Sequence, residues 1–389
     1  MTSPVEVVLV GCGVIGWTHA AALQELAEGN IVGVVDPAPA AAEALARSIE
    51  DRGKPKPSVF TSLQDALTSS QVDLVVLCTP SGLHVEQGLE VLRAGKHLVI
   101  EKPLDVDLAR ALRFEKAAVE AAGRGLVVSV ISQHRFDRAS RALAGAIRDS
   151  RLGTITSAIA SVAWWRSQQY YESGSWRGTW SMDGGGALMN QGVHTVDLLL
   201  QFMGRPVEVY AQTALLGHEG IEVEDTAAAT IRFEGGALAL LHATTAAYPG
   251  LTVRLQVMGT DGSAVVDGDQ LEYFHSKHAP SGDLDRIPDG QGNHAAHELA
   301  RFGDDVFPPG SDPQTYPLGH VRQYRDVLAA IASGHQPEVT VSDAVHALAL
   351  IRAVYVSATL NRPVLFTDVL EGDYDGVAVQ TGYAVQPSV

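Results

Sequence analysis

The chain has 389 residues, of which 46% are hydrophobic and 19% are charged, and its formal net charge is −17. This length favours about two domains, and the composition is that of a globular protein with enough apolar residues for a core. An excess of carboxylates repels phosphate backbones and anionic lipid surfaces, so we expect neither nucleic acid nor a membrane as partner. No apolar run approaches the ~18 residues of a membrane span, and we expect no signal peptide.

The first third of the chain alternates short apolar runs with amphipathic segments. The runs are rich in Val and Ile and almost wholly apolar, which is typical of parallel strands covered on both faces. Short connections between strand and helix imply right-handed crossovers and a parallel sheet. The expected strands are 5–10, 31–35, 72–78, 97–100 and 126–130, and the expected helices are 17–27, 38–52, 63–67, 85–94 and 107–122.

Two cysteines, Cys12 and Cys78, each follow an expected parallel strand. A stabilising disulfide is improbable in this context, and the pattern suits a protein of the reducing cytoplasm. We expect both side chains to be small buried hydrophobes.

A glycine-rich turn connects the first expected strand to the first helix. The turn fits G-x-G-x-x-G, and its position between a buried strand and a helix is the context that makes this pattern informative. The first glycine permits a tight turn, the second lets the backbone approach a pyrophosphate, and the third lets helix and strand pack closely. The helix N-terminus favours an anion. The expected cofactor contacts are Gly11, Cys12, Gly13, Val14, Ile15 and Gly16.

Asp36 ends the second expected strand, twenty residues after Gly16. A carboxylate at this place accepts hydrogen bonds from the adenosine ribose hydroxyls and repels a 2′-phosphate. The following residues, 37–40, supply no Arg or Lys that would hold that phosphate. The sequence therefore predicts NAD(H) rather than NADP(H) as cofactor.

From about residue 130 the pattern changes to longer strands that are joined by Gly-rich turns, which favours a mostly antiparallel sheet. The expected strands are 155–163, 207–213, 226–233, 237–245, 252–259 and 263–267, and the expected helices are 320–332 and 342–360. Residues 275–316 show little periodicity and predict a long irregular excursion. The tail from Glu371 is expected to be peripheral. We divide the chain into a cofactor domain, 1–128, and a substrate and oligomerisation domain, 129–389.

Three further segments, 78–84, 95–103 and 183–197, occur in an order that resembles the Gfo/Idh/MocA oxidoreductases. They read CTPSGLH, GKHLVIEKP and DGGGALMNQGVHTVD, and the resemblance spans residues 5–365. It implies an α/β protein with an N-terminal Rossmann domain, a doubly wound parallel sheet, and a C-terminal α+β domain with a large open, mostly antiparallel sheet. The outer face of that sheet is implied to make homodimer or homotetramer contacts, and the active site is implied where the nicotinamide emerges between the domains.

The resemblance implies catalytic roles for four residues. An ammonium is a good donor to a substrate oxygen, which suits Lys102, and an imidazole near its ordinary pKa can take a hydroxyl proton, which suits His194. Asp197 would lie on the same helical face as His194 and orient its ring. Inositol dehydrogenase has Asp four residues before this His, whereas this chain has Asn190, which indicates nucleotide-linked or other sugars rather than inositol. The structural alternatives are a surface lysine, a helix-capping histidine and a solvated aspartate.

The same resemblance implies further cofactor contacts, and a cis Lys102–Pro103 bond. The implied contacts are Thr79, Pro80, Ser81, His84, Glu101 and Lys102.

Four of the five tryptophans fall within residues 164–180, interleaved with Tyr and Arg. Aromatic faces suit the C–H faces of sugars, and Arg suits hydroxyls, carboxylates or phosphates. We therefore expect a substrate pocket here, with a packed loop or subunit interface as the alternative. The predicted substrate contacts are Arg135, Arg166, Tyr170, Trp176, Arg177 and His320; Arg135 equally suits a salt bridge.

Histidines at 275, 278, 294 and 297 raise the question of a metal site. His294-x-x-His297 is an acceptable ligand spacing, but no cysteine or well-placed carboxylate pattern joins it. We expect no metal, and the predicted chemistry needs none.

The sequence thus predicts a cytoplasmic NAD(H)-dependent dehydrogenase that acts on a carbinol or ketone carbon of a sugar, cyclitol or sugar derivative, possibly nucleotide-linked. Two alternatives stay open: a non-catalytic NAD sensor of the same fold, and an enzyme that keeps NAD tightly bound as a redox shuttle. Retention of both Lys102 and His194 argues against the sensor.

The first prediction concerns Asp36. We expect the Michaelis constant for NAD(H) to be clearly lower than that for NADP(H), because the Asp36 carboxylate repels a 2′-phosphate. Steady-state kinetics with both cofactors measure this difference. A clear preference for NADP(H) would contradict the role assigned to Asp36.

Overall fold

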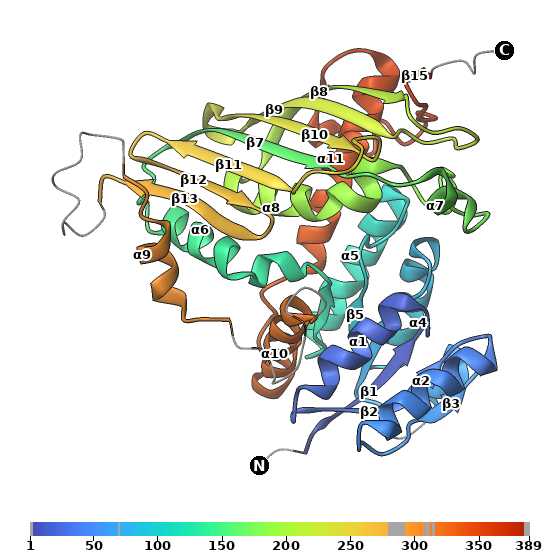
Figure 1. The fold of residues 1–389 in the computed structure, drawn as a ribbon. Helices are drawn as coiled ribbons and strands as arrows, with labels where there is room; N and C mark the ends of the chain where they lie inside the picture. The colour runs from blue at the N-terminus through green and yellow to red at the C-terminus, as the bar shows by residue number, and fades with distance from the viewer. Residues whose placement is uncertain are drawn as a thin grey trace. The chain divides into compact units, whose positions relative to one another are not determined.

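A computed structural model describes residues 3–68, 71–278, 292–305, 307, 312 and 316–384. The chain forms two compact units (Figure 1). The first unit combines Met1–Gln133 with Phe307–Val345, and the second combines His134–Val306 with His346–Val389.

The first unit is built on a six-stranded sheet in the order β3-β2-β1-β4-β5-β6, in which every neighbouring pair is parallel. This is the strand order of a doubly wound dinucleotide-binding fold. Val7, Leu9 and Val76 are fully buried, as expected for strands that helices cover on both faces. The strands are β1 (Val5–Val10), β2 (Gly29–Val35), β3 (Ser58–Phe60), β4 (Leu74–Leu77), β5 (His97–Ile100) and β6 (Val128–Val130).

The expected helices of this unit are present. They are α1 (Val14–Gln24), α2 (Pro39–Asp51), α3 (Leu63–Leu67), α4 (His84–Arg93) and α5 (Leu108–Gly123). Helix α1 begins three residues earlier than predicted because Gly13 is its N-cap, so the helix opens directly from the glycine-rich turn. The edge strand β3 was not predicted, because three residues are too few to show a period.

Helix α10 (Leu318–Ser333) also belongs to the first unit, although it lies far along the chain. Val321, Tyr324 and Val327 are buried in the same apolar cluster as Leu9 and Leu23. The compact unit therefore differs from the predicted domain range, which assigned 307–345 to the second domain. Burial of an apolar helix face, rather than covalent continuity, decides this membership.

The second unit contains a nine-stranded sheet in the order β13-β12-β11-β7-β10-β9-β8-β14, with β15 beside β8. Pairing is antiparallel except between β7 and β10 and between β8 and β15, so the prediction of a mostly antiparallel sheet is confirmed. The strands are β7 (Ile155–Ala163), β8 (Pro206–Leu215), β9 (Thr226–Phe233), β10 (Leu238–Thr244), β11 (Arg254–Gly259), β12 (Gly262–Asp267), β13 (Gln270–Ser276), β14 (Val364–Leu365) and β15 (Tyr383–Ala384).

One face of this sheet packs against helices, with α6 and α8 lying along it (Figure 1). Strand β9 alternates between buried and exposed residues, as a strand with one covered face should. Helix α6 was not predicted. The helices of the second unit are α6 (Arg138–Arg148), α7 (Gln168–Glu172), α8 (Val193–Met203), α9 (Ala295–Leu299) and α12 (Phe366–Glu371), together with α11 (Val341–Leu360), whose residues up to Val345 belong to the first unit.

Helix α11 is long and apolar enough to cross a membrane by length and composition, but 67% of its most apolar window is buried inside the structure. It resembles the core helix of a globular protein in this respect.

The tail after α12 is held to α11, because Arg352 of α11 donates hydrogen bonds to the carbonyl oxygens of Tyr374 and Val377. The predicted irregular segment 275–316 contains α9, while most of its remainder and residues 385–389 lie outside the described residues.

Candidate functional site

The glycine-rich turn has the geometry that its pattern predicts. Gly11 has a φ of +97°, and a side chain there would place Cβ 2.5 Å from the carbonyl oxygen of Cys78. A Cβ on Gly16 would overlap the carbonyl oxygen of Gly11, so the helix can approach the strand only without a side chain. A Cβ on Gly13 would meet nothing within 4 Å. The turn is therefore tight on its protein side and open at Gly13, which suits the close approach of a pyrophosphate.

Asp36 lies at the end of β2 and holds this turn in place. Its carboxylate accepts hydrogen bonds from the backbone N–H of Cys12 at 2.9 Å and of Ala38 at 2.8 Å. No side chain caps the N-terminus of α1, and Val14 is 90% exposed, so this helix end is suited to bind an anion. These residues fit NAD, whose pyrophosphate and ribose would meet α1 and Asp36.

The two cysteines are free and buried, as predicted. Burial, together with the carboxylate of Asp36, raises the pKa of Cys12 to about 12. Burial also raises the pKa of Cys78 well above its ordinary value. Both groups are therefore neutral thiols that fill space beside the cofactor turn.

The loops after β4 and β5 are joined through His84. This side chain is buried, and its ring nitrogens lie 2.8 Å from the carbonyl oxygens of Pro103 and Thr79. The Thr79 hydroxyl donates to Gln87 at 2.6 Å. Pro80 and Ser81 are more accessible, and Ser81 begins a short 3-10 helix, η1 (Ser81–Leu83). His84 thus links the two loops through its hydrogen bonds, and its contact with a cofactor stays a prediction.

A buried polar chain runs from α10 to the residue before Lys102. Tyr324 Oη lies 2.5 Å from His19 Nδ1, and His19 Nε2 lies 2.8 Å from Glu101 Oε1. Burial lowers the pKa of His19 and raises that of Tyr324, so a neutral His19 accepts from the tyrosine and donates to the glutamate. The pKa of Glu101 is held well below its ordinary value by His19, by His320 and by the positive charge of Lys102, which together outweigh burial. Glu101 is therefore a charged carboxylate inside the first unit.

Lys102 follows this carboxylate and is partly buried. Its backbone N–H donates to Glu101 Oε2 at 2.9 Å, and the Lys102–Pro103 bond is cis, as the resemblance implied. His320 is buried beside the same carboxylate. Its Nε2 is 3.7 Å from Glu101 Oε1, and its ring meets that of His19 edge-on. The ligand atoms of His19, Glu101 and His320 are mutually close enough for a metal ion, but two of them already share a hydrogen bond.

The glycine-rich segment 183–192 of the second unit is pinned by the buried Glu224. Its carboxylate accepts from the N–H groups of Gly186 and Leu188, both at 2.9 Å, and from the Tyr355 hydroxyl at 3.0 Å. A Cβ on Gly186 would overlap the carbonyl oxygen of Glu224. Glycine is therefore required here by close approach, and the turn leads into a π-helix, η3 (Ala187–Gly192), and then α8.

Asn190 and His194 stand on consecutive elements, η3 and α8, and both are partly buried. The Asn190 amide donates to Asp183 Oδ1 at 2.8 Å and to the carbonyl oxygen of Gly185 at 3.2 Å. The side chain is thus held in a fixed orientation by the turn that precedes it.

Asp197 is buried, and both of its oxygens accept from Arg135, at 2.7 and 2.6 Å. Arg135 therefore forms the salt bridge that was one of its two predicted roles. A bidentate pair of this kind fixes both side chains, and it holds α8, the helix that also carries His194.

The aromatic and basic residues predicted to bind substrate do cluster. Arg177 stacks over Tyr170 and Trp176, with its Cζ 4.3 and 4.4 Å from the ring centroids, and donates to the Tyr170 hydroxyl at 2.8 Å. Arg166 stacks over the same tyrosine at 5.0 Å, and its buried Nε has no hydrogen-bond partner among the described residues. Trp176 is 37% exposed. The cluster is preorganised by cation–π contacts, and its contact with substrate stays a prediction.

Sequence reasoning missed several residues that hold the site. His19, Tyr324 and Glu224 lack a local signal, because each acts through partners at least 36 residues away. His134, which precedes Arg135 in the chain, was not predicted either. It lies beside His194, with ring centroids 5.0 Å apart and an interplanar angle of 77°.

Comparison with known proteins agrees with this geometry. A model described as "Oxidoreductase family, NAD-binding Rossmann fold" matches residues 5–130, and a "GFO/IDH/MocA C-terminal domain" model matches residues 140–265. The structure is similar to the WlbA dehydrogenase of Bordetella pertussis in complex with NADH and UDP-GlcNAcA. That similarity has 31% identity and a TM-score of 0.79, and covers 94% of this chain and 98% of that one.

Two relatives from Bacillus subtilis differ in cofactor. A scyllo-inositol 2-dehydrogenase (NADP(+)) is 25% identical, covering 81% of this chain and 84% of the relative. A scyllo-inositol 2-dehydrogenase (NAD(+)) is 27% identical, covering 79% and 87%. Both cofactors therefore occur among relatives, and the role of Asp36 in choosing between them stays a prediction.

A second prediction concerns Glu224. Burial raises its pKa from 4.5 to about 7, although three hydrogen bonds favour the charged form. The unfolded chain therefore releases this proton at a lower pH than the folded chain does. The stability that the folded chain gains by holding the proton is fully present below about pH 4.5 and is lost as the pH rises through about 7. The difference corresponds to about 3 kcal/mol as an order of magnitude. Glu224→Gln cannot titrate, so we expect its stability relative to the native chain to increase with pH.

Urea unfolding midpoints of both chains at acidic and mildly alkaline pH measure this effect. Glu50→Gln, at an exposed glutamate, is the matched control and should follow the native chain at both pH values. A constant difference between Glu224→Gln and the native chain would show that folding does not raise the pKa of Glu224.

Proposed function

This chain belongs to the Gfo/Idh/MocA family of NAD-binding oxidoreductases, and from that premise we propose which of its residues carry the reaction. It transfers hydride between a nicotinamide cofactor and a carbinol or ketone carbon of a sugar-like substrate. The observation that carries the cofactor assignment is the turn at residues 11–16, closed on its protein side, open at Gly13 and followed by an uncapped helix. Gly13, the N-terminus of α1 and Asp36 would hold NAD, which supplies the hydride acceptor or donor when bound.

We assign proton transfer to Lys102 and His194. In the oxidation direction, the Lys102 ammonium donates a hydrogen bond to the hydroxyl oxygen and stabilises its developing negative charge. As the carbinol C–H and O–H bonds break and the C=O bond forms, His194 accepts the hydroxyl proton. Asn190 positions a neighbouring hydroxyl. The anchors described above, Glu101 for Lys102 and the Arg135–Asp197 pair for α8, support a fixed orientation of each residue within its own unit.

We propose a sugar, cyclitol or sugar derivative as substrate, with nucleotide-linked sugars favoured. The amide at Asn190 and the similarity to a dehydrogenase solved with UDP-GlcNAcA support this choice. The stacked cluster of Arg166, Tyr170, Trp176 and Arg177 offers aromatic faces for a sugar ring and guanidinium groups for an acid or phosphate. We also propose that the protein is located in the cytoplasm, where NAD(H) and such substrates are available.

Two other functions are distinguished by simple measurements. A sensor of the same fold would bind NAD(H) without turnover of any sugar or polyol. An enzyme that keeps NAD as a redox shuttle would carry NADH through purification, which the absorbance spectrum of the pure protein would reveal.

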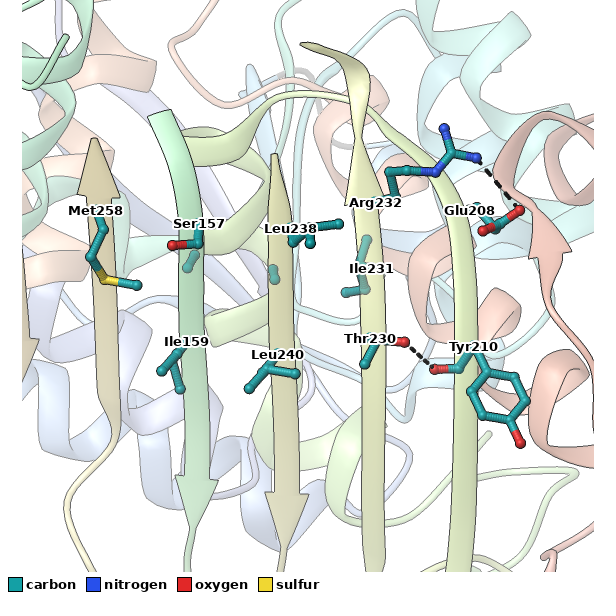
Figure 2. A pocket seen from close by; sticks show the side chains of 12 residues that line it. Ser157, Ile159, Glu208, Tyr210, Thr230, Ile231, Arg232, Leu238, Leu240 and Met258 are labelled. Atoms are coloured by element: carbon teal, nitrogen blue, oxygen red, sulfur yellow. Dashed lines mark hydrogen bonds and ion pairs between the residues drawn. The ribbon is translucent and has the colours of Figure 1, made fainter. Parts of the chain in front are cut away.

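We also propose a homodimer or homotetramer formed through the uncovered face of the nine-stranded sheet. Figure 2 shows Ile159, Leu238, Leu240 and Tyr210 projecting from neighbouring strands on this face. Leu238 and Leu240 are 58% and 51% exposed, which is unusual for two leucines of one strand. An ion pair between Arg232 and Glu208, 3.5 Å apart, lies at the edge of this patch. An apolar centre with a charged rim is typical of a subunit interface.

A third prediction tests the catalytic pair. A panel of UDP-GlcNAcA, scyllo-inositol, myo-inositol and other polyols identifies a substrate by NADH formation. With that substrate, Lys102→Ala and His194→Ala should each lower kcat by about 10²–10⁴-fold, since each removes a group that acts on the proton in the transition state. NADH binding, measured by fluorescence, should persist. Lys116→Ala, at an exposed lysine of α5, is the control. Near-normal turnover of Lys102→Ala would refute its role.

A fourth prediction tests the sheet face. Leu240→Arg places a charge in the centre of the apolar patch, so we expect the molar mass in solution to fall to that of a smaller assembly. Light scattering during size-exclusion chromatography measures the mass. Leu251→Arg, at a leucine that is 69% exposed outside the sheet, should leave it unchanged. A native chain that is already monomeric would overturn the proposed interface.

A further inference from the structure

A second histidine lies against the proposed proton acceptor within the second unit. His134 belongs to a short 3-10 helix, η2 (Gln133–Phe136), and His194 belongs to α8. Their rings meet edge to face, with centroids 5.0 Å apart. Two imidazolium charges at this separation repel each other, so the protonation of one ring disfavours that of the other. The pair therefore holds one proton more readily than two.

Two carboxylates decide which ring holds that proton. His134 Nδ1 donates to Asp137 Oδ2 at 2.7 Å and lies 3.4 Å from Asp269 Oδ1. These contacts, with a smaller contribution from Asp197, raise the pKa of His134 against the opposing effect of burial. The positive charge of Arg135, the next residue in the chain, is balanced by its bidentate pair with Asp197. The charges around His134 therefore favour its imidazolium form.

The local backbone shows that these carboxylates are directed at His134. Asp137 is the residue before α6, where an aspartate normally caps the helix, yet it makes no capping hydrogen bond and accepts from His134 instead. Asp269 lies in the two-residue turn between β12 and β13 with a φ of +64°, a conformation that Asp tolerates better than most residues. Its side chain is 55% exposed, so the His134 cluster reaches solvent.

We propose that His134 is a positioning residue for His194: it holds the shared proton, with Asp137 and Asp269 as its counter-charges, and keeps His194 neutral near neutral pH. A neutral imidazole has the lone pair that accepts a hydroxyl proton. The proton that His194 takes up during oxidation can then leave without His134 losing its own. This inference rests on the role proposed for His194, but its test does not require turnover.

The experiment follows the histidine ring signals of the isotopically labelled protein by NMR during a pH titration, with His194→Gln used to assign His194. His134→Gln removes the neighbouring cation, so the titration midpoint of His194 should rise by about one pH unit. His134→Arg keeps a cation at this place and should leave the midpoint low. His335→Gln, at an exposed histidine after α10, is the control for substitution itself.

Asp269→Asn provides a milder variant, because its side chain is half exposed and outside the strands. Loss of this counter-charge should raise the His194 midpoint by a smaller amount than His134→Gln. An unchanged His194 midpoint in both His134→Gln and Asp269→Asn would overturn the inference, as would equal shifts for His134→Gln and His134→Arg. Normal turnover of His194→Ala would instead remove the proposed function while leaving the titration result intact.

Discussion

A carboxylate can be buried only where donors or positive charges replace its lost hydration, and this constraint organises the candidate residues within each of the two units. In the first unit, Glu101 is satisfied by His19 and by the N–H of Lys102. In the second unit, Glu224 is satisfied by two backbone N–H groups and Tyr355. Each carboxylate thereby fixes the backbone that leads to a proposed catalytic residue.

Different groups compensate the two carboxylates for their lost hydration. Glu101 has a positive neighbour and a polarised histidine, and its pKa falls well below the ordinary range. Glu224 has only neutral donors, and its pKa rises to about 7. The first unit therefore keeps a permanent charge beside Lys102, whereas the turn before His194 is held by a group whose charge depends on pH. Hydrogen bonds alone do not offset burial as fully as a nearby charge does.

Much of the fold followed from local pattern. The parallel strands of the first unit were predicted because buried strands are continuously apolar. The longer strands of the second unit were predicted from strand-like segments that Gly-rich turns connect. The fingerprint turn was predicted from the spacing of its three glycines between a strand and a helix, although the contact that excludes a side chain at Gly11 comes from the distant Cys78. Helix α6 was missed, and α10 was assigned to the other domain, because membership of a core depends on partners that no local window contains.

The sequence by itself indicated the cofactor class, because the glycine pattern at residues 11–16 follows a buried strand and is followed at Asp36 by the carboxylate that suits an unphosphorylated ribose. It also located Lys102 and His194 through motifs. Only the tertiary structure decided what surrounds them: that Arg135 pairs with Asp197, that His320 lies beside Glu101, and that His134 faces His194. The electrostatic state of a buried group depends on charges that folding brings close to it. The number of residues between two such groups along the chain does not predict their distance in the folded protein.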